Sequence, residues 1–359
     1  MGVHLKAKDA IPWWGKIASV NSFAMPFNDA SVITIVFTIA IVSTNTITLL
    51  VISWTESLRN INKIYLGSMT VADLCVGLFI TPFAVFSTFS NTWIFNNKIF
   101  CHIEAYLLAI FFIAGVYSLS WISVDHYLAI RKPQRHKTAM SSTRATCWII
   151  FAWLAAFSFC SPPLFSFQRA SYYKEVYMCS IDAGPQKPYF VTAGILVLCP
   201  AFLALLFTNS YIFTERFRSK KHMFENILID TASRPKNYFM NFVVSVIFVL
   251  SWLPWLVLQI AGTFLESHSE YPHKVHFYFL WLAIGNSFYK FFVYVALSCD
   301  FRRGLKQLCC NHECKCTHCT ASQRMNINLI TAGSKAWYET KYETKYRNNV
   351  NEMAYLTER

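Results

Sequence analysis

The sequence predicts an all-α membrane protein built as a bundle of seven transmembrane helices. Hydrophobic residues make up 55% of the chain and charged residues only 14%, whereas a soluble protein carries about 25% charged residues. The apolar residues are concentrated in long stretches, and a helix needs roughly 20 such residues to cross a bilayer. A closed β-barrel is the other structure whose backbone hydrogen bonds are all satisfied in lipid, but these stretches are too long for barrel strands. They lie at about 31–54, 62–88, 99–130, 144–166, 188–213, 237–264 and 275–297.

The charges between the stretches predict the orientation of the chain. Residues 131–144 carry five Lys or Arg and no acid, and residues 215–236 carry six Lys or Arg against three acids. Loops rich in Lys and Arg stay in the cytosol, so seven spans place the N-terminus outside and the C-terminus inside. The net charge of +13 then faces anionic lipid headgroups or a partner protein, which argues against nucleic-acid binding. We expect a multi-pass plasma-membrane protein.

Outside the seven-helix domain, 31–298, the chain has three further parts. Residues 1–30 form an extracellular N-terminal segment, and the polar cytoplasmic tail 311–359 is predicted to be disordered. Between domain and tail, 299–310 should form an amphipathic helix on the membrane surface. The reason is that apolar residues recur at helical spacing opposite basic ones, namely Phe301, Leu305 and Leu308 against Arg302, Arg303 and Lys306.

The cysteines divide between the two sides of the membrane. Cys309 and Cys310 end the amphipathic helix and are candidates for palmitoylation. The Cys and His residues that follow, up to Cys319, could bind zinc, but their spacing fits no zinc pattern. We therefore expect acylated or free thiols and no metal site. On the oxidising side, Cys101 opens the third stretch and Cys179 precedes the fifth, which predicts a disulfide between them.

A series of polar, proline and aromatic landmarks occurs in order on all seven stretches. Over about residues 30–310 these landmarks resemble the rhodopsin-like, class A G-protein-coupled receptors, and most closely the group around the amine, adenosine and related small-ligand receptors. The landmarks are Asn45; Leu66 to Leu74, with Asp73, then Pro82; Trp93 before Cys101; Asp125-His126-Tyr127 and Pro133; Trp153; Pro200; Phe248 and Ser251-Trp252-Leu253-Pro254; Trp281 and Gly285-Asn286-Ser287; and Tyr294 with Asp300-Phe301-Arg302-Arg303.

The resemblance implies an extracellular ligand bound between the helices and signalling to a heterotrimeric G protein, with arrestin and receptor kinases as further partners. Independently of the family, a carboxylate in mid-bilayer such as Asp73 is costly and is functional by default. Pro254 breaks the helix ladder beside the bulky Trp252, so the sixth span can bend there. The implied switching and coupling residues are Asp73, Asp125, His126, Tyr127, Trp252, Pro254, Lys290 and Tyr294.

The chain departs from the family's pattern where the switching residues lie. The family's Asp-Arg-Tyr is Asp-His-Tyr at 125–127. A His side chain is shorter than Arg, and its unperturbed form titrates at about pH 6.5, whereas Arg stays charged. The family's Asn-Pro-x-x-Tyr is Lys-Phe-Phe-Val-Tyr at 290–294, without the proline. The family's fifth-span Tyr is Thr208, and Tyr211 lies three residues further on. The alternative to an ordinary receptor is therefore a receptor-shaped protein with weak, altered or absent G-protein coupling.

Lys290 is predicted to pair with Asp73. By resemblance, Lys290 replaces an Asn that lies near the second-span carboxylate, where the family binds sodium. A lone Lys inside a bilayer is costly unless it finds a partner, and Asp73 is the mid-span carboxylate. Alternatively, Lys290 extends to the cytosolic interface, but Tyr294 lies a further turn along the span, which favours the pair.

The ligand pocket is assigned through the resemblance alone. Leu108 stands where amine receptors have Asp, and Ile284 stands where opsins have the retinal-binding Lys, so an amine or retinal lacks its usual partner. The other positions are mostly apolar, with Gln259, Glu104 and His276 as polar groups, which suits a small, largely apolar ligand. The expected lining is Leu108, Ala109, Phe112, Thr192, Ala193, Leu196, Trp252, Trp255, Leu256, Gln259, Leu280 and Ile284.

Other classes of protein have less support. The sequence shows no Ser/His/Asp, metal-ligand or phosphate-loop pattern typical of an enzyme, and no cofactor is predicted. A transporter is the rival from a different class. Against it, the stretches show no paired repeat or broken helices, and charge deep within the membrane is limited to Asp73 and Lys290.

Overall fold

The computed structural model describes residues 27–55, 60–90, 93, 98–132, 135–136, 140–160, 170–181, 191–192, 194–222, 235–264 and 273–309. Within these ranges seven helices are long and apolar enough to cross a membrane, which confirms the predicted fold class. Several predicted features lie outside the described residues: most of the N-terminal segment, Ala193, Cys310 and the tail 311–359.

The spanning helices follow the predicted stretches closely. The described part of the fourth span ends at Cys160, whereas the sequence predicts a helix to about 166, and residues 161–169 lie outside the described ranges. The helices are α1 (Phe27–Trp54), α2 (Asn60–Phe79) followed by α3 (Thr81–Ser90), α4 (Lys98–Arg131), α6 (Ser142–Cys160), the π-helix η2 (Gly194–Leu198) followed by α8 (Cys199–His222), α9 (Pro235–Phe264) and α10 (His273–Leu297).

The second span is divided at Ile80, two residues before Pro82. Proline has no N–H, and its ring collides with the carbonyl four residues earlier, here that of Leu78. The chain turns at Ile80, where the Phe83 N–H donates to the Ile80 carbonyl at 3.2 Å. The proline thus splits the helix into α2 and α3 without ending the span.

Helix α4 lies at the centre of the bundle. It packs against α2, α6, α8 and α9, while α1 packs against α2 and α10, and α10 against α9. The outer faces carry large apolar side chains that are 55–61% exposed, such as Val36, Phe151, Leu203 and Leu250. Such an outer surface suits contact with lipid tails, which are as apolar as these side chains.

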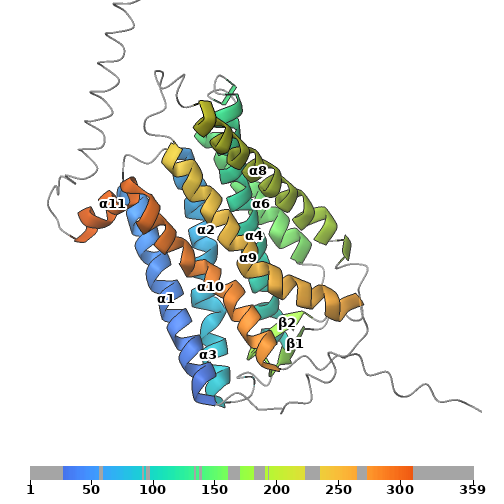
Figure 1. Cartoon of the computed structure of the whole chain (residues 1–359). Coiled ribbons are helices and arrows are strands. Elements are labelled where there is room, and N and C mark those ends of the chain that lie inside the picture. The colour runs from blue at the N-terminus through green and yellow to red at the C-terminus, as the bar shows by residue number, and fades with distance from the viewer. Residues whose placement is uncertain are drawn as a thin grey trace, which may run out of the picture.

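A β-hairpin and a short amphipathic helix mark opposite ends of the bundle (Figure 1). The hairpin pairs β1 (Ala170–Tyr173) with β2 (Met178–Ile181) in antiparallel register. At the other end, α11 (Cys299–Cys309) confirms the predicted amphipathic helix. Gly304 allows α11 to lie close to α1, because a Cβ at this position would lie 2.1 Å from Thr55 Oγ1. We refer to these as the hairpin end and the α11 end.

Candidate functional site

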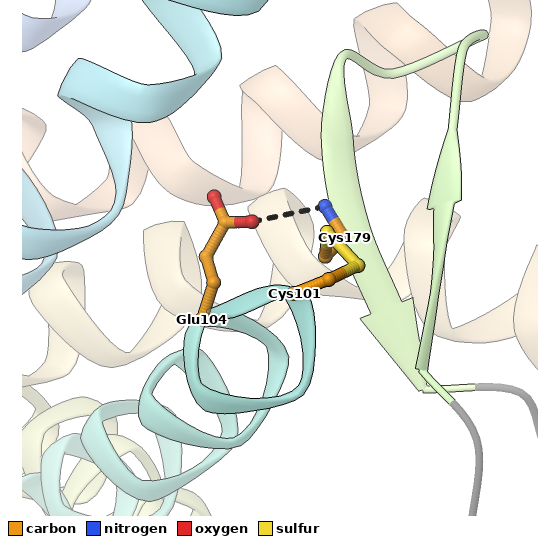
Figure 2. The surroundings of a disulfide bond; sticks show 3 residues. All are labelled: Cys101, Glu104 and Cys179. Atoms are coloured by element: carbon orange, nitrogen blue, oxygen red, sulfur yellow. Dashed lines mark hydrogen bonds between the residues drawn. A yellow bond between two sulfur atoms is a disulfide. The ribbon is translucent and has the colours of Figure 1, made fainter. Parts of the chain in front are cut away.

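The hairpin is attached to the start of α4 by a disulfide between Cys101 and Cys179 (Figure 2), which confirms the predicted bond. Glu104, one turn further along α4, is 2% exposed. Its Oε2 accepts a hydrogen bond from the Cys179 backbone N–H at 3.1 Å. Tyr172 of β1 packs beside Trp93, with ring centroids 5.9 Å apart, and burial raises the pKa of Tyr172 to about 12. The hairpin is therefore held across this end by covalent, polar and aromatic contacts.

The two charges predicted in mid-membrane meet inside the bundle. Lys290 Nζ on α10 forms an ion pair with Asp73 Oδ2 on α2, the pairing that the sequence predicts. The residues are only 5% and 8% exposed, so Lys290 does not extend to the interface. Beside them, Asn45 Nδ2 of α1 donates to the Ser287 carbonyl of α10 at 3.0 Å. These polar bonds connect α1, α2 and α10.

A small cavity lies beside the ion pair. Its lining includes Asp73 and Lys290 together with Phe112, Trp252 and Asn286. Its volume is about 30 Å³, enough for about two water molecules, whereas sites for organic ligands typically measure about 300–1,000 Å³. At this depth the described cavity therefore fits water rather than an organic ligand.

Trp252 lies in an aromatic cluster next to the cavity. Its ring centroid is 4.1 Å from that of Phe112 on α4, and Phe112 stacks on Phe248 at 6.1 Å. Pro254 lies within α9, and this helix changes direction along its length (Figure 1). A change in the bend of α9 would therefore move Trp252 against Phe112.

Most of the predicted ligand-lining residues lie in the interior. Leu280 is 4% exposed and belongs to a cluster of buried hydrophobic residues. Ala109 and Trp255 pack against this cluster. Leu256 and Gln259 on α9 are half-buried. Four other predicted residues meet at the cavity, namely Leu108, Phe112, Trp252 and Ile284.

Leu196 and Thr192 do not join this group. Leu196 is 59% exposed and Thr192 is also exposed, so their place in the ligand lining stays a prediction. Leu196 belongs to the π-helix of residues 194–198. Its wider turn changes the direction of the side chains relative to an α-helix. Val197, 2% exposed, takes the inward position, and its carbonyl accepts a hydrogen bond from the Tyr117 hydroxyl at 2.7 Å.

At the α11 end, the residues in place of the family's Asp-Arg pair are buried. Asp125 is 1% exposed and His126 is 5% exposed. Asp125 Oδ1 lies 2.9 Å from Nε2 of His136, which ties α4 to residues 135–136 in the following loop. The sequence did not indicate His136, because its distance from Asp125 depends on the path of that loop.

Tyr127 and Tyr211 meet edge to face at the same end. Their ring centroids are 5.0 Å apart, with planes at 83°. The Thr208 hydroxyl instead donates to the Ala204 carbonyl of its own helix at 2.7 Å. Phe207 of α8 also meets Tyr127, with ring centroids 5.5 Å apart, so Phe207 and Tyr211, and not Thr208, supply the rings with which α8 contacts α4 here.

Three buried polar residues connect α4, α8 and α9 one turn before His126. Ser123 Oγ accepts hydrogen bonds from Asn241 Nδ2 of α9 at 2.9 Å and from Asn209 Nδ2 of α8 at 3.2 Å. We call Ser123, Asn209 and Asn241 the Ser123 hub. The hub was not predicted, although two Asn in apolar spans are a usable signal, because buried amides in a membrane form hydrogen bonds with other helices.

The predicted lipidation sites lie at the edge of the described chain. Cys309 is the last residue of α11, and Cys310 lies outside the described ranges. Palmitoylation of these two thiols stays a prediction. Within the part of the chain that the structure describes, no group of three or more His, Cys, Asp or Glu could hold a metal ion.

Comparisons with known proteins agree with this geometry. The family model described as 7 transmembrane receptor (rhodopsin family) matches residues 44–294. The histamine H2 receptor of Cavia porcellus is 25% identical over 338 residues, which cover 90% of this chain and 93% of that receptor. "Probable G-protein coupled receptor 21" of Homo sapiens is 28% identical over 319 residues, covering 85% and 89%.

Solved structures show the same fold. Squid rhodopsin superposes with a TM-score of 0.67 at 19% identity, over 82% of this chain and 90% of that one. The matched family model covers most of the seven-helix domain, and its landmarks lie on the helices described above. The chain therefore belongs to the rhodopsin family of seven-transmembrane receptors, which is a receptor family and not an enzyme family.

Proposed function

We propose that the protein is a G-protein-coupled receptor of the plasma membrane, with its N-terminus and hairpin end outside the cell. Two observations support this orientation. The Cys101–Cys179 disulfide lies at the hairpin end and suits an oxidising compartment. The basic loops 131–144 and 215–236 connect helices at the α11 end, and such loops stay in the cytosol.

The ligand is proposed to be a small, largely apolar molecule that binds between the helices beneath the hairpin. The histamine H2 receptor, one of the relatives described above, is named for an amine, but Leu108 of this chain provides no counter-ion for a cationic amine. The cavity beside Trp252 is too small for an organic molecule. A ligand must therefore bind nearer the hairpin or displace side chains such as Trp252, and that displacement would couple binding to the bend of α9.

The signalling partner is proposed to be a heterotrimeric G protein at the α11 end. His126 of α4 is buried at this end, and the Ser123 hub connects α4, α8 and α9 one turn deeper. A partner that inserts between the helices must break the hub. Arrestin and receptor kinases would share this face and the tail, and palmitoyl groups on Cys309 and Cys310 would hold α11 at the membrane lipids.

A second candidate function is a receptor-like protein with weak or absent coupling. It is favoured by His126, which stands in place of the family's Arg, and by Asp125, which is bonded to the loop residue His136. A transporter is less favoured. The receptor proposal rests mainly on the course of α4. This helix connects the disulfide-bonded hairpin at one end of the bundle with the Asp-His-Tyr segment at the other end.

The proposal is tested by nucleotide exchange on purified G proteins. Receptor in lipid vesicles is mixed with one G protein of each class, and binding of a non-hydrolysable GTP analogue is compared with receptor-free vesicles. We expect receptor-dependent exchange for at least one class, increased by members of a panel of uncharged small molecules. Thermal stabilisation by a panel member without exchange in any class would favour the uncoupled alternative, and its uptake into sealed vesicles would favour a transporter.

Asn241→Leu is expected to raise basal nucleotide exchange about threefold. An interhelical hydrogen bond in a membrane contributes about 0.6 kcal/mol on average, and loss of the 2.9 Å bond to Ser123 removes one contact that holds α9 against α4. Ser123→Ala removes both bonds and should raise exchange further. Ser210→Ala, at an exposed position on α8, is the control and should change nothing. Unchanged basal exchange in Ser123→Ala would show that the hub does not restrain the helices.

A further inference from the structure

A carboxyl group of α4 is enclosed beneath the disulfide-bonded hairpin, and the proposed function does not use it. Glu104 is 2% exposed, and Cys101 and Cys179 beside it are 4% and 1% exposed. In Figure 2 the Glu104 side chain extends from α4 toward β2, with one carboxyl oxygen directed at the Cys179 N–H and the other directed away from it. The hairpin therefore covers an ionisable group when it lies on the bundle.

The surroundings of Glu104 suit an uncharged carboxyl group. Its Oε2 accepts one hydrogen bond, from the Cys179 N–H at 3.1 Å, whereas its Oε1 is buried and has no hydrogen bond within the described ranges. No Lys, Arg or His of the described chain forms an ion pair with Glu104. A buried charge without a partner is far more costly than a buried neutral group, so the docked hairpin favours the protonated acid.

The titratable groups of the hairpin give this carboxyl group no positive partner. Tyr172 of β1 interacts electrostatically with it, and burial is the main reason that the pKa of Tyr172 is raised to about 12, so this phenol stays neutral. Tyr177 and the acid Glu175, both in the hairpin turn, also raise the pKa of Tyr172. Tyr173 and Lys174, the remaining titratable residues of the strand and turn, are exposed.

The other elements around the carboxyl group add no positive partner. The described residues of α3 and β2 include no Lys, Arg, His, Asp, Glu or Tyr. His102 of α4 is two residues from Glu104, and side chains at this spacing on a helix do not face each other. A proton can neutralise the buried Oε1 without a cavity, whereas a water molecule or a metal ion needs space and several polar partners.

We propose that Glu104 is a proton-binding site that makes the docking of the hairpin depend on pH. When the hairpin opens, water reaches the carboxyl group, and a Glu in water loses its proton above about pH 4.3. Docking therefore takes up one proton. Its stabilising effect is complete at acid pH and is lost as the pH rises, by about tenfold in the docking equilibrium for each pH unit until the docked carboxyl group itself ionises.

The site would make the hairpin a sensor of acid on its own side of the membrane. In the proposed orientation that side is outside the cell, so acidification would hold the hairpin closed over the proposed ligand site. Only this assignment of the compartment rests on the proposed function. Proton binding itself requires neither a ligand nor a G protein, so it is tested without them.

The test is the rate at which a water-soluble phosphine reduces the Cys101–Cys179 bond in the full-length protein in lipid nanodiscs. Both cysteines are buried, so reduction requires the hairpin to open. The rate at each pH is divided by that of a small reference disulfide. We expect reduction at least about tenfold faster at pH 8 than at pH 6, within the hundredfold that two pH units allow for one proton. Equal normalised rates at the two pH values would overturn the proposal, whether or not any variant folds.

Three variants assign the effect to one group. Glu104→Gln is uncharged at every pH and keeps an oxygen for the Cys179 N–H, so at pH 8 it should be reduced as slowly as the unmodified protein at pH 6. The controls Glu175→Gln, in the hairpin turn, and His102→Gln, on α4, should keep the full pH effect. A pH effect that survives in Glu104→Gln, or that disappears in a control, would assign the proton to another group. Rapid reduction of Glu104→Gln at both pH values would show that docking needs the charged carboxylate, and would also refute the proposal.

Discussion

Lys290→Ala is expected to lower the free energy of unfolding by about 3–5 kcal/mol. The replacement leaves the carboxylate of Asp73 charged and unpaired inside the bundle, and an uncompensated buried charge costs roughly that much. The two groups form an ion pair and are 5% and 8% exposed, so water does not replace the lost partner. Thermal unfolding of the purified receptor in lipid nanodiscs, together with the fraction that reaches the cell surface, measures the effect.

The double variant tests whether the loss comes from the pair. Asp73→Asn combined with Lys290→Ala should recover most of the stability, because it removes the unpaired charge, and a double-mutant cycle then shows strong coupling. Lys306→Ala, at an exposed position on α11, is the control and should change little. By the resemblance, the ammonium stands where the family binds sodium, so we expect exchange of sodium for choline not to alter stability or agonist affinity. Additive effects of the two single variants would contradict the pairing.

Cys101→Ser or Cys179→Ser is expected to destabilise the protein by up to about 4 kcal/mol. The bond joins residues 78 positions apart. In the chain-entropy model, a disulfide that closes a loop of this size stabilises the folded state by about this free energy, because it restricts the unfolded chain. Each variant should also loosen the hairpin and lower surface expression and ligand binding together.

The double variant Cys101→Ser/Cys179→Ser is the matched control for unpaired thiols. It should be no less stable than either single variant, because the single variants already lack the bond. The Cys179 backbone N–H donates to Glu104 Oε2, and a change of the side chain at 179 leaves this donor in place. The hydrogen bond should therefore keep part of the hairpin attached in the two single variants and in the double variant. Peptide mapping that finds both thiols free in the folded protein would contradict the bond.

The fold could be predicted because its cause is visible in the sequence. Seven apolar stretches of spanning length permit little except a helix bundle in a membrane, and spacing alone predicted α11. Asp73 and Lys290 could be paired because the resemblance places position 290 near the second-span carboxylate, and because charges in mid-membrane are few and each requires a partner. In both cases one strong physical constraint left few alternatives.

The features that were missed depend on how helices are rotated. Helices α4, α8 and α9 are apolar on most faces, so periodicity does not show that Ser123, Asn209 and Asn241 point at one another. Within the π-helix at 194–198, Val197 is buried and Leu196 is exposed, and π-helices have no reliable sequence signature. His136 reaches Asp125 through a loop whose path no local pattern determines.

The proposed function predicts a receptor whose coupling is limited by His126. Arg in this position stays charged and reaches further than His, so His126→Arg should raise basal and stimulated signalling at equal surface level. The control is Arg303→His on α11, which makes the opposite exchange of the same two side chains at a half-buried position outside the spanning helices. It tests whether the exchange of Arg and His alone alters the signal.

The most direct measurement is nucleotide exchange on purified G proteins of each class by receptor in vesicles, with His126 and with Arg at this position. The proposal predicts receptor-dependent exchange in at least one class and a clear increase in that class with His126→Arg. Exchange no greater than that of receptor-free vesicles in every class, with either side chain, would contradict G-protein coupling as the function of this protein.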